Sequence, residues 1–349
     1  LNLQSRNLAL YPVELQTHNL LIIYFMTNII NFIAKEIKDN TRIDYYLSKK
    51  YNNLSRTKIK NLILKKFLKI NGITVTDPSK KINSGDKIYF EAFEEKDVPL
   101  KPYDYKLKIV YEDNDIIVIN KNHGISIHPG AGNYDNTIVN ALIKYNKKNL
   151  SDLGDKFRPG IVHRIDKDTS GLIVIAKNNF SHIELAKQFK SHTVNRVYIA
   201  MVWGKLRPRA GRIENFIIRS KKNRQLMEVN LSKGKKAITN YKTIKIFENE
   251  KIPTFSLVEC KLETGRTHQI RVHLSNKGNF ILGDKHYKKR FKKINNVNEA
   301  VLSVLKNLDR QFLHAKILGF NHPRNKKKLI FECELPEDLN KILKKLVNT

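Results

Sequence analysis

The chain has 349 residues, 41% of them apolar, which is enough for one large domain or two modules with proper cores. Its formal net charge of +32 predicts a polyanionic partner, most simply a nucleic acid. Lysine outnumbers arginine 49 to 16, and drift in an AT-rich genome would give the same surplus, so the charge alone is a moderate indication. The chain has only two cysteines, Cys260 and Cys333, which argues against a disulfide framework. It has no run of about 20 apolar residues, which argues against a membrane span.

The first 40 residues are predicted to be a poorly ordered extension. The chain starts at Leu1 and its first methionine is Met26. The apolar stretch 20–26 is too short and badly flanked for a secretory signal. We expect Met26 to be the true start and the protein to be cytoplasmic, with an organellar matrix as the alternative if the extension is a presequence.

Residues 41–93 are predicted to form a small module of two helices and a hairpin. Ser55 caps the second helix, whose apolar residues recur at helical spacing and leave basic side chains pointing outward. These basic side chains are Arg56, Lys58, Lys60, Lys65 and Lys66. Asn71-Gly72 between alternating apolar residues indicates a hairpin. This order, with the runs S-R-T-x-I-K and I-N-G, resembles the S4 RNA-binding domain, a small αL-type fold.

A polar linker at residues 94–104 leads into a second domain at 105–345. Its opening hairpin and a helix at 137–145 are followed by a predicted capping box at 181–184 that starts a helix ending near Phe189. Strand-like runs occur at 196–203, 237–246, 255–262, 311–315 and 330–334, and residues 286–309 are predicted to be a surface insertion with a short helix. We therefore predict an α+β fold with a mixed, mainly antiparallel central sheet flanked by helices and loops.

The most informative segment is residues 160–172, where Asp166 stands beside an arginine and a histidine on a turn between two strand-like apolar runs. A carboxylate held on such a turn suits covalent or general-base chemistry, although a plain structural turn acid would look the same in isolation. The segment resembles the H-R-L-D-x-x-T-S-G signature of the RluA/RluD family of RNA pseudouridine synthases, with Ile165 as its one departure.

Two further segments carry the same resemblance. Residues 262–274 are very similar to the family's L-x-T-G-R-T-H-Q-I-R-V-H-L, and residues 128–133, H-P-G-A-G-N, are most similar to the RluD branch. The resemblance extends over about residues 41–345. It implies an isomerase that breaks the C1′–N1 bond of uridine, turns the uracil and rejoins it through C5, with no cofactor and no metal.

The resemblance also implies roles for individual residues. Asp166 would be the catalytic acid, with Arg266 beside it to keep it ionised and oriented, and Tyr198 would stack on the detached uracil. Arg164 would fill the space left by the flipped base or hold the displaced backbone. The other predicted RNA contacts are His163, Arg271, His128, Arg56, Lys58 and Lys60. Of these, His163 is expected mainly to order its loop, and Arg271 is equally a candidate for gripping phosphate and for catalysis.

Several alternatives stay open. An S4-containing methyltransferase would need a Gly-rich loop after a strand, which the sequence lacks. A non-catalytic ribosome-assembly factor would have lost Asp166, Tyr198 or Arg266, and all three are present. Large-subunit (23S-type) ribosomal RNA is the expected substrate, with tRNA or dual specificity as the alternative. The sequence leaves open which uridines are modified, whether Asp166 attacks C1′ or acts at C2′, and the oligomeric state, for which a monomer is the default.

Overall fold

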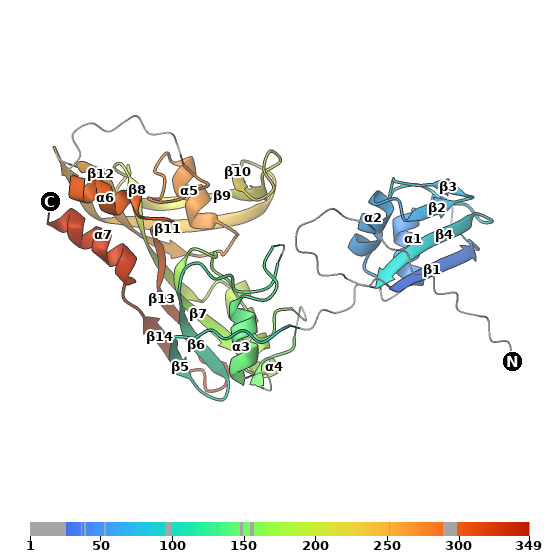
Figure 1. Cartoon of the computed structure of the whole chain (residues 1–349), viewed down its shortest axis with the longest axis horizontal. Coiled ribbons are helices and arrows are strands. Elements are labelled where there is room, and N and C mark those ends of the chain that lie inside the picture. Colours follow the sequence, from blue (N-terminus) through green and yellow to red (C-terminus); the bar gives the residue numbers. More distant parts are fainter. Residues whose placement is uncertain are drawn as a thin grey trace. The chain divides into compact units, whose positions relative to one another are not determined.

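The computed structural model describes residues 26–35, 37, 40–51, 54–94, 100–130, 132–146, 149–153, 157–250, 252–288 and 299–348. The chain divides into two compact units, Leu1–Pro99 and Leu100–Thr349 (Figure 1). Residues 1–25 lie outside the described residues, and so does the prediction about where the chain starts. None of the described helices has the length and apolar character needed to cross a membrane.

The first unit is a four-stranded sheet with two helices packed on it. Its elements are β1 (Met26–Ile33), α1 (Ile43–Lys50), α2 (Arg56–Leu64), β2 (Leu68–Ile70), β3 (Ile73–Thr74) and β4 (Lys87–Glu94), with strand order β1-β4-β2-β3. As predicted, the Ser55 side chain accepts a hydrogen bond from the Lys58 amide and caps α2. Asn71 and Gly72 both adopt positive φ, which the tight β2–β3 turn requires.

The expectation that residues 1–40 are poorly ordered is wrong for β1. This strand pairs antiparallel with β4 along its whole length, from Met26 opposite Glu94 to Ile33 opposite Lys87. Ile30 and Phe32 alternate toward the apolar core of the unit, and β1 covers an edge of β4 that would otherwise be unpaired. The β-branched and aromatic residues of this stretch, M-T-N-I-I-N-F-I, were the available signal.

The second unit is built on a ten-stranded sheet, within the part of the chain that the structure describes, with strand order β10-β9-β11-β12-β8-β13-β7-β6-β5 and β14 paired to β13. Its strands are β5 (Ile109–Glu112), β6 (Ile116–Lys121), β7 (Ser170–Ala176), β8 (Asn195–Trp203), β9 (Ala210–Arg219), β10 (Met227–Asn230), β11 (Lys235–Asn249), β12 (Ile252–Leu262), β13 (Leu313–Asn321) and β14 (Lys328–Glu332). Its helices are α3 (Ile138–Asn146), α4 (Asn179–Lys190), α5 (Gln269–Asn276), α6 (Glu299–Lys306) and α7 (Glu337–Val347). Only β7 and β13 pair in parallel among the described strands, so the predicted mixed, mainly antiparallel sheet is confirmed.

Apolar side chains cover both faces of the sheet at its centre. In β7 the side chains of Ile173 and Ile175 join one core cluster, while Leu172 and Val174 join the cluster on the opposite face. Helices α3, α5 and α7 contribute to the first cluster, and Leu185 of α4 contributes to the second. A strand buried on both sides gives an unbroken apolar run, which is why β7 was recognisable in the sequence.

The predicted capping box at 181–184 is wrong. Helix α4 starts at Asn179, and the side chain of Asn178 is the cap, because it accepts a hydrogen bond from the Ser181 amide at 2.9 Å. Ser181 is buried, and its hydroxyl donates to Asp115 instead. Strands β9 and β10 were not predicted either, because their apolar residues are few and mostly half-exposed.

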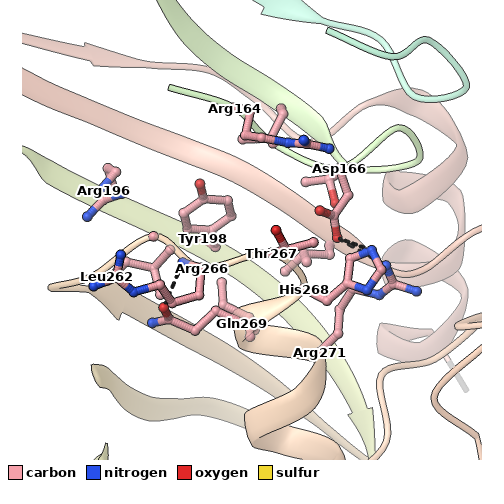
Figure 2. A pocket seen from close by; sticks show the side chains of 15 residues that line it. Arg164, Asp166, Arg196, Tyr198, Leu262, Arg266, Thr267, His268, Gln269 and Arg271 are labelled. Atoms are coloured by element: carbon pink, nitrogen blue, oxygen red, sulfur yellow. Dashed lines mark hydrogen bonds and ion pairs between the residues drawn. The ribbon is translucent and has the colours of Figure 1, made fainter. Parts of the chain in front are cut away.

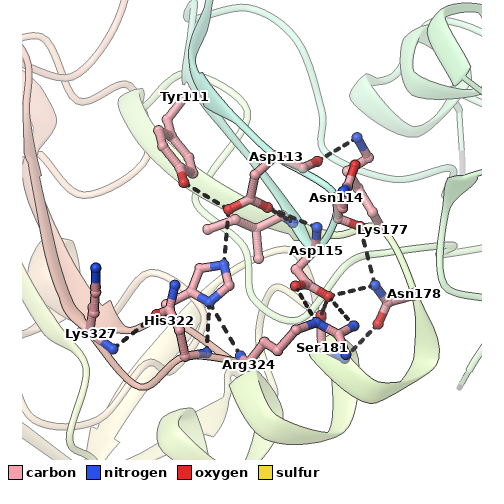
Figure 3. Close-up of polar contacts among 12 residues, drawn as sticks. Tyr111, Asp113, Asn114, Asp115, Lys177, Asn178, Ser181, His322, Arg324 and Lys327 are labelled. Atoms are coloured by element: carbon pink, nitrogen blue, oxygen red, sulfur yellow. Dashed lines mark hydrogen bonds and ion pairs between the residues drawn. The ribbon is translucent and has the colours of Figure 1, made fainter.

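Asp115 belongs to a polar network that joins the β5–β6 turn to α4 and to the β13–β14 turn (Figure 3). Its carboxylate accepts two hydrogen bonds from Arg324, at 2.7 and 2.8 Å, and further ones from Asn178 and Ser181. With nearby Asp113 and His322 it could in principle hold a metal ion. Since these oxygens already accept hydrogen bonds from protein groups, we assign the network to joining the three segments.

Candidate active site

The three sequence segments predicted to converge do so at one pocket of the second unit (Figure 2). The loop before β7 contributes Asp166, strand β8 contributes Tyr198, and the turn before α5 contributes Arg266. Asp166 keeps about a sixth of its side chain exposed, at 17%, and so can meet a ligand in the pocket.

The arginine that binds Asp166 is Arg271, and the prediction that Arg266 does so is wrong. Nη1 of Arg271 donates to Oδ2 of Asp166 at 3.0 Å. Arg266 lies before the first turn of α5, and its Nε donates instead to the carbonyl oxygen of Lys236 on β11 at 2.9 Å. Arg271 is in the first turn of α5, where its side chain is buried and bonds to the Asp166 loop.

Arg271 is itself held by a second carboxylate. Its Nε and Nη2 donate to the two oxygens of Asp284, at 2.7 and 2.9 Å, in a forked geometry. Burial opposes the charge on Arg271, but the hydrogen bonds and charge of Asp284 and then of Asp166 outweigh it and raise the arginine pKa. The guanidinium therefore stays charged and fixed in direction, and it presents one N–H to Asp166.

The turn from Thr264 to Gln269 is clamped to β11. Gln269 is buried; its Oε1 accepts from the Thr264 hydroxyl and from the Arg266 amide, and its Nε2 donates to the Ile238 carbonyl. A Cβ at Gly265 would lie 2.5 Å from Nη1 of Arg196, so a side chain there would displace the end of the Arg196 side chain. These contacts give a physical reason for the threonine, glycine and glutamine of the T-G-R-T-H-Q segment.

Tyr198 and Arg196 reach the pocket from β8. Burial raises the pKa of Tyr198 to about 12, so its phenol stays neutral at the edge of the pocket. Arg196 was not among the predicted site residues, although it lies two positions before Tyr198. It is buried, donates from Nη2 to the Glu263 carbonyl at 3.0 Å, and has no partner for Nε among the described residues.

Arg164 and His128 are in contact at the mouth of the site. Nη1 of Arg164 donates to Nε2 of His128 at 3.1 Å, and Nδ1 of His128 donates to its neighbour's carbonyl, on Pro129. The H-P-G-A-G-N loop is thereby brought to the Asp166 loop. Arg164 is exposed, so its guanidinium is accessible from outside the pocket.

His163 orders the loop, and its predicted RNA contact is not supported. Nε2 of His163 accepts the Val174 amide at 3.0 Å, and its ring stacks on Phe189 with 4.5 Å between centroids. Burial lowers the pKa of His163 to about 3, so the ring stays neutral. It therefore fixes the approach of the loop to β7.

A second set of buried side chains supports the Asp166 loop from beneath, and the sequence interpretation missed it. Nζ of Lys121 donates to the Lys167 carbonyl at 2.9 Å, and Arg310 donates to the Ser170 hydroxyl at 3.2 Å. Gln311 donates to the Thr169 hydroxyl at 3.1 Å. Lys121 is the last residue of β6, and Arg310 and Gln311 lie just before β13. Lys121 and Arg310 are far from the loop in the sequence. Their position next to apolar runs was the one local sign of a buried role.

In the first unit, Arg56 pairs with Asp44 while half of its side chain stays exposed, so its predicted RNA contact stays a prediction. Its guanidinium forks onto the Asp44 carboxylate with two contacts of 3.1 Å, and Arg42 forks onto the same buried carboxylate. Lys60 is exposed on α2 and Lys58 is half-buried. Arg56 therefore serves the fold of this unit first, and the lysines remain the outward cations of α2.

A small basic unit followed by a carboxylate pocket is the architecture of an RNA-modifying enzyme. A profile described as RNA pseudouridylate synthase matches residues 115–276, and one described as S4 domain matches residues 41–88. The "Ribosomal large subunit pseudouridine synthase D" of Zymomonas mobilis is 43% identical over 88% of this chain and 94% of its own length. The protein of that name from Yersinia pestis is 36% identical over 87% and 90%.

A solved structure agrees with the sequence relatives. "Human RNA Pseudouridylate Synthase Domain Containing 4" matches with a TM-score of 0.51 and 25% identity, over 68% of this chain and 92% of that one. The chain belongs to the RNA pseudouridylate synthase family and carries an S4 domain before its catalytic domain. It is a pseudouridine synthase, an isomerase that converts uridine to pseudouridine in RNA.

Proposed function

We propose that this enzyme isomerises specific uridines of large-subunit ribosomal RNA, with Asp166 as the catalytic carboxylate and without a cofactor. The observation that carries the proposal is the partly exposed Asp166 carboxylate, held at the pocket by a buried arginine. The names of the bacterial relatives, which are large-subunit pseudouridine synthases, support the choice of RNA. The alternative is that the enzyme modifies uridines of tRNA, or of both RNAs.

The geometry leaves one oxygen of Asp166 for the substrate. Oδ2 is bound by Arg271, whereas Oδ1 has no hydrogen-bond partner among the described residues. In either route the reaction breaks the C1′–N1 bond: Asp166 attacks C1′, or it removes the C2′ proton. The uracil then turns and C5 bonds to C1′, which releases the Asp166 carboxylate in the first route and returns a proton to C2′ in the second. C5 loses its proton and N1 gains one, so the product is an isomer and no electrons are exchanged.

The residues around Asp166 take complementary roles in this proposal. Tyr198 stacks on the uracil while it turns, because its ring lines the same pocket and stays neutral. Arg164 occupies the space left when the base leaves its stack, since its guanidinium is exposed beside the pocket. Arg266, whose Nη atoms have no partner among the described residues, binds substrate phosphate or uracil oxygen.

Pseudouridine mapping tests this proposal. Unmodified ribosomal RNA is incubated with the wild type, Asp166→Asn or Asp168→Asn, and carbodiimide-dependent primer-extension stops are compared. Asp168 is the matched control, because it lies in the same loop but does not line the pocket; its carbonyl oxygen accepts from Arg310 and its charge acts on Lys121. We expect stops with the wild type and Asp168→Asn and none with Asp166→Asn. Stops with Asp166→Asn would remove Asp166 from the mechanism. If the wild type gives stops on tRNA incubated in parallel but none on ribosomal RNA, the substrate is tRNA.

A further inference from the structure

His268 stands beside Asp166 and has no role in the mechanism proposed above. Its Nε2 lies 4.0 Å from Oδ2 of Asp166. The residue is non-glycine yet adopts a left-handed backbone, with φ 56° and ψ 19°, directly before α5. Strained backbone of this kind persists where the surrounding structure holds it, and often at functional sites. The conformation brings the imidazole to the wall of the pocket.

Tyr287 determines which nitrogen of His268 carries the proton. The Tyr287 hydroxyl oxygen accepts the Met227 amide proton at 2.7 Å, and it lies 2.9 Å from Nδ1 of His268. Among the described residues, Nδ1 of His268 is the acceptor within reach of the hydroxyl proton, and we therefore assign Nδ1 the acceptor role. A neutral imidazole with an unprotonated Nδ1 carries its proton on Nε2, the nitrogen that faces Asp166.

The surroundings of His268 fix its ring and keep it neutral. Its ring meets Tyr287 edge-on, with 5.6 Å between centroids, and Tyr287 in turn lies beneath the Arg271 guanidinium at 4.9 Å. The charged and titratable groups that face His268 are Asp166, Arg271, Asp284, Arg164 and Tyr287. Burial, ahead of these charges, lowers the pKa of His268 below the ordinary histidine value.

We infer that His268 is a positioning residue for Asp166. Its neutral Nε2–H helps to orient the carboxylate, whereas a protonated His268 would hold the carboxylate in an ion pair. This inference rests on the proposed function, in which Asp166 is the reacting acid. At 4.0 Å the neutral Nε2–H faces the carboxylate without a hydrogen bond in the free enzyme, and a catalytic contact of this length closes when substrate binds. Arg271 already brings one positive charge to Oδ2, and a second charge from protonated His268 would stabilise the resting carboxylate further and make it less reactive. The enzyme therefore needs His268 neutral.

The pH dependence of kcat on a target RNA tests the inference with full-length protein. Wild type should lose rate as the pH falls, through a group that titrates below the ordinary histidine range. His268→Gln keeps an N–H donor that cannot titrate, so it should retain most of the neutral-pH rate and lose this acid limb. His268→Ala should lower kcat by about tenfold with little change in KM, because the carboxylate loses orientation. All three chains share the left-handed backbone strain at this position.

His273→Gln is the matched control. His273 is a buried histidine of α5, close in sequence to His268, but its nitrogens contact Thr239 and Asn215 at 2.9 Å and not Asp166. This variant should keep the wild-type acid limb. If His268→Gln keeps the wild-type limb, or His268→Ala keeps the wild-type kcat, the inference is overturned.

A titration by NMR separates this inference from the proposed function. The His268 ring is followed in histidine-labelled wild type and Asp166→Asn. The Asp166 charge favours protonated His268, so the pKa of His268 should be lower in Asp166→Asn, and neutral His268 should carry its proton on Nε2. An unchanged pKa, or a proton on Nδ1, would overturn the inference. An active Asp166→Asn enzyme would instead overturn the proposed function, whatever the titration shows.

Discussion

At the scale of single residues, the site depends on one arginine that bonds two carboxylates. Arg271 is buried between Asp284, whose side chain is fully buried, and Asp166, which is partly exposed. Asp284 also accepts the backbone amides of His286 and Tyr287. A carboxylate that holds the arginine on one side leaves the other side to orient the reacting acid, so Asp284 acts on Asp166 through Arg271.

Exchanging Arg271 and Arg266 in turn for methionine separates their roles. Arg271→Met leaves Asp284 buried without its partner, so the free energy of unfolding should fall by about 3–5 kcal/mol and activity should be lost. Arg266→Met removes a half-buried side chain with one backbone contact, so it should change stability by less than about 1 kcal/mol while weakening the reaction. Denaturant unfolding and single-turnover rates check this. Equal losses of stability in the two variants would contradict the assignment.

At the scale of elements, the site lies where the Asp166 loop enters β7 beside β13. Arg310 connects this loop to helix α7, because it donates to the Ser170 hydroxyl and forks onto Asp338, at 2.6 and 3.0 Å. The C-terminal helix α7 therefore contributes to holding the loop, although it contributes no residue to the pocket. Lys121 of β6 adds a second support, because its Nζ donates to the Lys167 carbonyl of the loop.

Gly171, in β7, is the position at which this junction tolerates no side chain. Its φ is +117°, and a Cβ there would overlap the carbonyl oxygen of Ala315 on β13. Gly171→Ala should destabilise the enzyme by more than about 4 kcal/mol, because the parallel pairing must open. Gly278→Ala is the control: φ is +83° with open space around it, so only backbone strain of about 1–2 kcal/mol is expected. Thermal unfolding measures both, and similar melting temperatures would refute the steric argument.

At the scale of the whole molecule, buried neutral histidines make stability depend on pH. Burial lowers the pKa of His163 to about 3 and the pKa values of His273 and His314 to about 4. Unfolded histidines titrate near about 6.5, so between that pH and about 4 the unfolded chain binds protons that the folded chain excludes. The free energy of unfolding should therefore fall as the pH drops through this window. Melting temperatures between pH 7.5 and 5 test it, and a constant or rising value toward acid would contradict it.

The net charge of +32 bears on how the enzyme holds RNA. If cationic side chains on both units contact phosphates, binding releases counterions and the affinity falls steeply with salt. We expect a linear decrease of log affinity with log salt concentration in filter-binding experiments on the wild type. Binding that hardly changes between low and high salt would show that the positive surface is not what holds the RNA.

The sequence by itself determined the two-part α+β organisation, the Ser55 cap and the three segments that form the pocket. Each of these depends on neighbours in the chain: apolar periodicity, a capping side chain, or residues adjacent within one motif. Asp166 and Tyr198 could be placed at the pocket for that reason.

Only the tertiary structure decided which side chains meet. Asp166 and Arg271 are 105 positions apart, and the phase of α5 turns Arg271 toward the acid, while Arg266 donates to the Lys236 carbonyl of β11. The pairing of β1 with β4 likewise depends on a partner more than 50 positions away, as does the support of the Asp166 loop by Arg310. Contacts of this range are set by the packing of whole elements, and no local pattern in the chain records them.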